Sequence, residues 1–160
     1  MADKQHRYAL STTWTGNRGS GTSSYRDYAR DHEVRFAGKP DQVLLGSSDA
    51  AFRGDPSRFN PEELLLAALS QCHLLSYLHA CVMAGIVVLD YTDDATGTMI
   101  TTADGSGRFT EVTLHPQVRI AAESDVDLAL AAHDRAHRMC FIANSVNFEV
   151  RHQPRVTRAE

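Results

Sequence analysis

Three cysteines and several histidines are the side chains in this chain best suited to chemistry. Cys72 and Cys81 lie within one apolar stretch, residues 60–85, and Cys140 follows Cys72 by 68 residues. A cysteine thiolate can act as a nucleophile, as a metal ligand or as half of a disulfide, and a histidine can assist as a base or a ligand. A buried cysteine can also serve simply as a small apolar core residue. The spacing of the cysteines has to decide between these roles.

Helical geometry separates the roles of the two cysteines in the apolar stretch. Cys81 follows Cys72 by nine positions, which on a helix places it about 180° around the axis, so the two cannot form a disulfide with each other. We interpret Cys81 as a core residue. Cys72 lies about 18 Å from the start of the stretch, too far for the helix dipole to stabilise a thiolate. His79 shares the face of Cys72 but lies about 10 Å along the axis, beyond hydrogen-bond reach. A reactive Cys72 therefore needs a cation from elsewhere, such as an arginine.

Two other uses of the thiols are open from the residues alone. His137 and Cys140 stand three positions apart on one predicted helical face, so a metal site can be drawn from them with Cys72 and a further ligand. The absence of a CxxC pair argues against this site. Eight histidines also offer bases for a Cys–His nucleophile in acyl transfer, but no oxyanion-hole motif accompanies them. The roles of His73, His79 and His137 stay open.

The stretch that carries Cys72 is predicted to be one long helix. Asn60 is a good N-cap, Pro61 suits the first helical position, Glu63 can cap in return, and Gly85 is suited to a left-handed C-cap. The helix covers about 24 residues and about 36 Å. Because apolar residues occur on all its sides, we expect it to be buried on most of them, in the core or between subunits. A chain of 160 residues can hardly cover such a helix alone, so we predict a homodimer.

The other segments show the strand period or helical spacing. Strands are expected at residues 8–15, 32–36, 43–46, 87–92, 96–102, 108–120 and 145–150, and a second helix is expected to open at Ser124, with Asp127 in a capping position, and to run toward Cys140. A turn rich in glycine and serine, residues 16–24, holds Arg18 near its tip. This order of elements, without repeats or a linker, predicts a single α+β domain over residues 1–160.

Composition restricts the classes of protein that this chain can belong to. Hydrophobic residues make up 42% and charged residues 22%, as in soluble folded proteins. The net charge of −4 and the absence of a basic run argue against a nucleic-acid partner. We see no apolar region typical of a secretory signal and no apolar run long enough to span a membrane, so we expect a cytoplasmic protein without a membrane partner. Three widely spaced cysteines do not form the framework of a disulfide-rich domain.

The stretches NPEELLLAALSQC and AHRMCFIANSV resemble the paired cysteine motifs of the OsmC/Ohr family, the osmotically inducible and organic hydroperoxide resistance proteins. The early segment WTGNRGSGT is similar to the family's first strand and its arginine-bearing glycine turn, and the likeness covers nearly the whole chain. It implies an OsmC-like fold, with antiparallel sheets wrapped around the central helices of an intertwined homodimer. It also implies a thiol-dependent peroxidase that reduces organic hydroperoxides to alcohols without a cofactor, reset by an external dithiol reductant, for which a lipoyl-type dithiol is a candidate.

The resemblance assigns four residues to the site by motif. Cys72 matches the peroxidatic cysteine, which forms a sulfenic acid, and Cys140 matches the resolving cysteine, which captures it as a disulfide. Glu62 matches the glutamate ten residues before the first cysteine, and Arg18 matches the arginine of the glycine turn, with Arg35 as the fallback. Because the helical rise separates Glu62 from its own Cys72 by about 15 Å, we expect the Glu62 that serves a given Cys72 to come from the other subunit.

Three departures from the family pattern indicate a divergent branch. Cys140 is followed by Phe141 where many relatives have proline, Cys72 is followed by His73 rather than an apolar residue, and Arg58-Phe59 precedes Asn60. The alternative to a peroxidase is an OsmC-like protein that binds a small ligand in an apolar interface pocket and has an inert Cys72.

Overall fold

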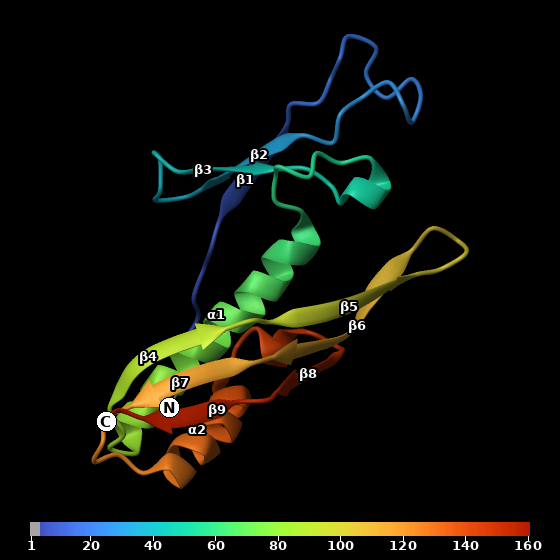
Figure 1. The fold of residues 1–160 in the computed structure, drawn as a ribbon. Coiled ribbons are helices and arrows are strands. Elements are labelled where there is room, and N and C mark those ends of the chain that lie inside the picture. Colours follow the sequence, from blue (N-terminus) through green and yellow to red (C-terminus); the bar gives the residue numbers. More distant parts are fainter. Residues whose placement is uncertain (1–3) are drawn as a thin grey trace. The chain divides into compact units, whose positions relative to one another are not determined.

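The computed structural model describes residues 4–160, and the chain divides into two compact units, Met1–Leu64 and Leu65–Glu160. The helix α1 (Pro61–Met83) begins in the first unit and continues through the second. Strands and a few helices are mixed along the chain, which confirms the α+β class (Figure 1). That residues 1–160 act as one domain stays a prediction.

The first unit contains a three-stranded antiparallel sheet. Its strands are β1 (Leu10–Trp14), β2 (His32–Phe36) and β3 (Val43–Gly46), in the order β1-β2-β3. The short 3-10 helix η1 (Ala50–Phe52) follows the sheet. The predicted strands 32–36 and 43–46 are confirmed, and β1 is shorter than the predicted 8–15.

The glycine turn of the first unit is organised by an asparagine side chain. Asn17 Oδ1 accepts hydrogen bonds from the backbone N–H groups of Gly19 and Gly21, at 2.9 and 3.0 Å. Gly19 has a φ of 109°, a left-handed conformation that favours glycine. Trp14 Nε1 donates to the carbonyl of Ala29 at 2.8 Å and ties the far end of the loop back to β1. Arg18 is exposed within a turn of defined conformation.

The start and end of α1 follow the predicted capping residues. The Glu63 N–H donates to Asn60 Oδ1 at 2.8 Å, and the Asn60 N–H donates to Glu63 Oε2 at 3.1 Å. This is a reciprocal capping box, in which two otherwise unpaired donors of the first turn are satisfied. Gly85 has a φ of 70°, and the N–H of Ile86 returns to the carbonyl of Cys81 at 2.9 Å. Both ends of the helix are therefore fixed by local chemistry.

The second unit contains two three-stranded sheets of mixed direction. One has the order β4-β7-β9, with β4 (Val88–Asp93), β7 (Pro116–Ile120) and β9 (Arg155–Arg158), and the other has the order β5-β6-β8, with β5 (Thr96–Thr101), β6 (Gly107–Leu114) and β8 (Glu149–His152). The pairs β4–β7 and β5–β6 are antiparallel, whereas β6–β8 and β7–β9 are parallel. The expected antiparallel pairing is therefore present in both sheets, and a parallel strand is added to each of them.

Two strand predictions in the second unit need correction. The predicted strand 108–120 is divided at His115, because Pro116 has no N–H to continue the ladder and the N–H of His115 donates instead to Asp93 Oδ1 at 2.7 Å. The predicted strand 145–150 begins only at Glu149, after the 3-10 helix η2 (Ala143–Ser145). The strand β9, which follows Pro154, was not predicted.

The second helix, α2 (Val126–Met139), has a different cap from the predicted one. Asp125 is the N-cap, and its carboxylate accepts the N–H of Leu128 at 2.9 Å. Ser124 Oγ instead accepts the N–H of Val87 at 3.1 Å, so this hydroxyl joins the helix entry to the segment before β4. The acidic cap complements the positive end of the helix dipole.

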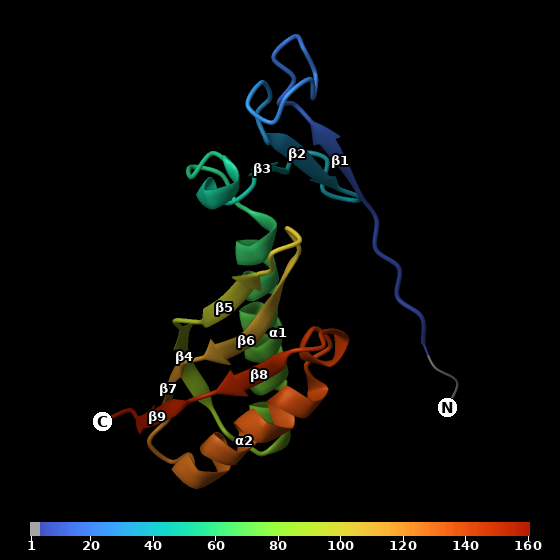
Figure 2. The same cartoon turned by 90° about the vertical axis from the view of Figure 1, so that its right-hand side faces the viewer.

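The core of the second unit lies between the helices and the sheets. Figure 2 shows α2 beside the C-terminal part of α1, and the two helices share an apolar cluster with β7 that contains Tyr77, Ala80, Cys81, Val118, Ile120, Ala129, Ala132 and Ala136. A second cluster centres on Leu69, Val112 and Leu114.

Part of α1 is not covered in this single chain. The exposed fractions of Leu75, Val82 and Met83 are 66%, 73% and 59%. Judged by its length and composition alone, α1 is long and apolar enough to cross a membrane. Core helices of soluble proteins can have the same length and composition. The helix therefore carries more apolar surface than its own chain buries.

Candidate active site

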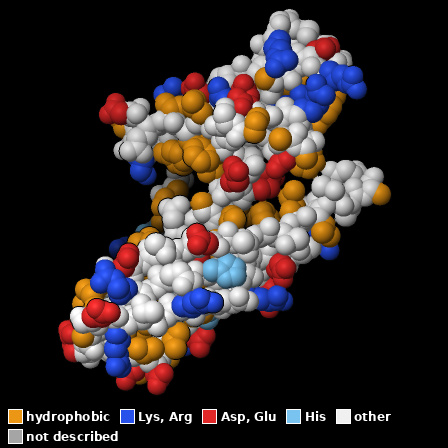
Figure 3. All heavy atoms as spheres, in the orientation of Figure 1, with side chains coloured by type: hydrophobic (Ala, Val, Ile, Leu, Met, Phe, Trp, Pro, Cys, Tyr) orange, Lys and Arg blue, Asp and Glu red, His pale blue; other side chains and the backbone are white. Residues whose placement is uncertain are grey.

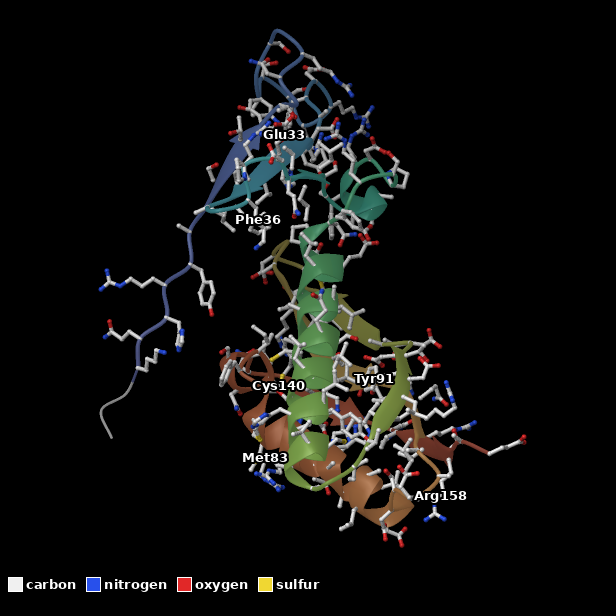
Figure 4. The ribbon with its side chains drawn as sticks, turned by 90° about the vertical axis from the view of Figure 1, so that its left-hand side faces the viewer. Glu33, Phe36, Met83, Tyr91, Cys140 and Arg158 are labelled. Carbon is white, nitrogen blue, oxygen red and sulfur yellow. The ribbon has the colours of Figure 1, made fainter. Side chains whose placement is uncertain are left out.

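Two of the three free cysteines meet in the second unit. Cys72 lies in the middle of α1 and is half-buried, whereas Cys140 directly follows α2 and is 1% exposed. The two thiols lie beside each other, close enough that Cys72 raises the pKa of Cys140. Figure 4 shows Cys140 beside the middle of α1. Two cysteines that are 68 positions apart in the sequence are thus brought together by the fold.

The end of α2 holds the Cys140 sulfur in place through backbone hydrogen bonds. The N–H of Cys140 donates to the carbonyl of His137 at 3.2 Å, and the N–H of Asn144 donates to the carbonyl of Cys140 at 3.0 Å. The N–H of Ala143 donates to Cys140 Sγ at 3.4 Å. Phe141, the residue that follows Cys140, is 81% exposed. The phenylalanine therefore leaves the burial of Cys140 intact.

Burial keeps Cys140 in its thiol form. Burial raises the pKa of Cys140 to about 11, and the neighbouring Cys72 acts in the same direction. The Ala143 N–H opposes the shift to a smaller extent. At neutral pH Cys140 is therefore protonated, and Cys72 is the sulfur of the pair that solvent and solutes can reach.

Cys81 is a core residue, as predicted. It is 1% exposed and lies in the cluster with Tyr77, Ile120 and Ala129. Burial raises the pKa of the Cys81 thiol. This cysteine is inert by its surroundings.

The predicted charged residues of the site all belong to the first unit. Arg18 is exposed in the glycine turn, and Glu62 lies in the first turn of α1. Arg35, the fallback arginine, lies in β2, where its Nη2 is 2.9 Å from Glu33 Oε2. Arg35 is therefore already paired with a carboxylate, whereas the pairing of Arg18 and Glu62 with Cys72 stays a prediction.

A buried group of histidines was not predicted. His73 Nε2 lies 3.1 Å from His133 Nδ1, and the ring of His152 is stacked 5.4 Å from that of His73. The ring of His137 lies 5.7 Å from that of His152. We call these four residues the histidine cluster. The spacing of His133 and His137, four positions apart on one helix face, was the signal that could have indicated half of it.

The structure gives no ready metal site. Within residues 4–160, no group of three or more His, Cys, Asp or Glu side chains is arranged to hold a metal ion. The metal alternative drawn from Cys72, His137 and Cys140 therefore gains no support from the geometry.

Comparison with known proteins gives the family. The model of the OsmC-like protein family matches residues 54–154. An OsmC-like protein of unknown function from Vibrio cholerae is 30% identical, with a TM-score of 0.82 over 94% of this chain and 100% of that one. No curated protein sequence matches the chain significantly.

Two solved structures of organic hydroperoxide resistance proteins share the fold at lower identity. The protein from Legionella pneumophila is 16% identical, with a TM-score of 0.70 over 97% of this chain and 99% of that one. OhrB of Bacillus subtilis is 15% identical, with a TM-score of 0.63 over 95% and 98% of the two chains. With a family model that spans most of the chain and both cysteine motifs, this protein belongs to the family of OsmC-like proteins.

Proposed function

We propose that this protein is a thiol-dependent peroxidase that reduces organic hydroperoxides to alcohols in defence against oxidative stress. The observation that carries the proposal is the contact between Cys72 and Cys140, one half-exposed and one buried. Two relatives of the same fold are organic hydroperoxide resistance proteins, which agrees with it.

The proposed reaction balances with the two cysteines and one external reductant. The Cys72 thiolate attacks the distal oxygen of ROOH, the O–O bond breaks, and the alkoxide takes a proton to leave as ROH. The sulfenic acid on Cys72 then reacts with the Cys140 thiol, which forms the disulfide and releases water. A dithiol donates two electrons and two protons to restore both thiols, and no bound cofactor takes part.

The burial of Cys140 gives the two cysteines different tasks. Because its pKa is raised to about 11, Cys140 remains a thiol and does not compete with Cys72 for peroxide. Its contact with Cys72 positions it to capture the sulfenic acid as soon as that forms.

The charged residues of the first unit supply the electrostatic part of the proposal. Arg18 stabilises the Cys72 thiolate and polarises the peroxide as charge develops on the leaving oxygen. Glu62 pairs with Arg18 and orients it. Because about 15 Å of α1 separates Glu62 from Cys72 of the same chain, we assign the orienting glutamate to the partner subunit.

We place the protein in the cytoplasm, without a nucleic-acid or membrane partner. On the face drawn in Figure 3, Lys and Arg side chains are interspersed with Asp and Glu, and the net charge is −4. A nucleic-acid partner would call for a basic surface instead.

The first test follows the sulfur chemistry directly. After treatment with cumene hydroperoxide, peptide mapping of the wild type should find a Cys72–Cys140 disulfide, because the two sulfurs are already in contact. The Cys140→Ser variant should instead accumulate a sulfenic acid on Cys72 that dimedone traps. Unmodified Cys72 in both proteins at excess peroxide would refute the peroxidase and favour the ligand-binding alternative.

We also propose a homodimer in which α1 is covered by a second copy. The exposed apolar side chains of α1 support it, since Leu75, Val82 and Met83 each expose more than half of their surface. Sedimentation of the wild type should give about twice the chain mass of 17.6 kDa. A Leu75→Glu, Val82→Glu variant should shift toward the monomer, whereas Leu128→Glu, a matched change at an exposed leucine of α2, should not. A monomeric wild type at assay concentration would contradict the proposal.

A further inference from the structure

The histidine cluster joins three elements of the second unit, with two of its four members buried and two partly buried. His73 comes from α1, His133 and His137 come from α2, and His152 comes from β8. His73 is 1% exposed and His133 is 0% exposed. Their rings are nearly parallel, at 10°, and a hydrogen bond of 3.1 Å joins His73 Nε2 to His133 Nδ1. One proton is shared between these two nitrogens.

The surroundings of the cluster fit neutral rings and not charged ones. His133 stacks on Tyr77 of α1 with 3.8 Å between ring centroids, and Tyr91 of β4 lies beside Tyr77. Among the described residues, His133 Nε2 and His152 Nδ1 are buried without a hydrogen-bond partner. A charged imidazole would add a further N–H donor to a pocket that already lacks acceptors.

One carboxylate contacts the cluster. Asp134 Oδ1 of α2 lies 3.5 Å from His152 Nε2, but the Asp134 side chain is 68% exposed. The pKa of His73 is lowered to about 4 and that of His133 to about 3, first by burial and then by the charges of neighbouring histidines. Burial also lowers the pKa of His152, which Asp134 opposes only in part.

The cluster lies where α2 is held to the rest of the unit and where α2 leads to Cys140. The buried face of α2 consists of three alanines and His133, so few large side chains pack this helix against the rest of the unit. Cys140 follows the last residue of the helix, three positions after His137. A loss of contact at His133 and His137 therefore also loosens the segment that positions the second sulfur.

We propose that the histidine cluster is an acid-sensitive latch, which holds α2 and Cys140 against α1 while its rings are neutral and releases them when the rings take up protons. The release itself is a property of the fold, and its effect on disulfide formation rests on the proposed function. As the pH falls below the ordinary histidine pKa, opening that separates the two sulfurs becomes more frequent.

Linkage between protonation and opening determines how the stability of the closed form changes with pH. When α2 separates from α1, His73 of α1 and His133 of α2 both lose their burial and regain the ordinary pKa of 6.5, so the open form binds more protons than the closed form. The stability that the neutral rings give the closed form is therefore fully present above pH 6.5 and is lost as the pH falls toward 4. Between pH 7.5 and pH 5.5 the two rings together raise the opening constant about 100-fold.

Amide hydrogen exchange of the full chain measures this opening. After correction for the intrinsic exchange rate, the protection of residues 126–139 should fall about 100-fold between pH 7.5 and pH 5.5. Residues 32–46, in the sheet of the first unit, provide the internal control and should keep their protection. Equal protection of residues 126–139 at both pH values overturns the latch, and so does an equal loss in both segments.

A pair of variants assigns the effect to the cluster. His133→Phe keeps a ring stacked on Tyr77 and removes one titrating group, so the loss of protection should shrink to about 10-fold. His79→Gln, at an exposed histidine of α1, should behave as the wild type. An undiminished 100-fold loss in His133→Phe overturns the assignment, and if that variant does not fold, the wild-type series alone decides. The exchange experiment needs neither peroxide nor reductant, so it distinguishes failure of the latch from failure of the peroxidase.

Discussion

The Cys72→Ser variant should lose at least about 1,000-fold in kcat/KM for cumene hydroperoxide, because the proposed reaction has no other nucleophile within reach of the substrate. Serine keeps the size of the side chain but does not form a comparable anion at neutral pH. The measurement is dithiol-dependent turnover of cumene hydroperoxide and of hydrogen peroxide, with the organic peroxide as the preferred substrate. The helix should remain folded, since Cys72 is half-buried and the change is nearly isosteric.

Two further cysteine variants serve as controls for the Cys72→Ser experiment. Cys81→Ala should retain the wild-type kcat/KM, because Cys81 is a core residue on the opposite face of α1. Cys140→Ser should turn over more slowly than the wild type, because the sulfenic acid on Cys72 must wait for the external dithiol when no adjacent protein thiol can capture it. Equal turnover by the wild type and Cys72→Ser would rule out the assignment of the peroxidatic sulfur.

The Arg18→Gln variant should lose about 100-fold in kcat/KM, since removal of one preorganised donor at a developing oxyanion typically costs that much. The loss should appear in the single-turnover rate of sulfenic acid formation and not in the later capture by Cys140. Arg18 lies in an exposed turn whose conformation is set by Asn17, so the substitution should leave the fold unchanged.

Arg35→Gln is the matched comparison for this experiment. Arg35 Nη2 already lies 2.9 Å from Glu33 Oε2, and such an exposed pair contributes little to stability, so we expect nearly wild-type turnover. The reverse order, with a large loss in Arg35→Gln and none in Arg18→Gln, would move the assignment to Arg35.

Local capping chemistry was the most predictable part of the fold. The start of α1 follows from Asn60, Pro61 and Glu63, and its end follows from Gly85, because these residues act on their own neighbours in sequence. The division at His115 depends on Asp93, 22 residues earlier, and β9 depends on a parallel partner far away in the chain. Ser124 was a plausible N-cap from the sequence, but in the structure its hydroxyl accepts the N–H of Val87 instead. Such competition between local and distant partners is invisible in a single sequence.

Part of the candidate site could be predicted from the sequence and part could not. The contact of Cys72 with Cys140 follows from the family resemblance and not from periodicity, since each cysteine alone is compatible with a core role. The histidine cluster combines residues of α1, α2 and β8, and only the pair on α2 has a recognisable spacing. Its remaining members, His73 and His152, are brought together by the tertiary fold.

The contact between a half-exposed and a buried sulfur also bears on the lifetime of the proposed enzyme. A sulfenic acid that meets a second peroxide becomes a sulfinic acid, a form that ordinary thiols do not reduce. The Cys140 thiol competes with that second peroxide as an intramolecular reactant, and well-oriented intramolecular reactions have effective molarities far above any peroxide concentration in a cell. In the proposed enzyme, the closeness of the two sulfurs would thus convert the sulfenic acid into a reducible disulfide before a second peroxide arrives.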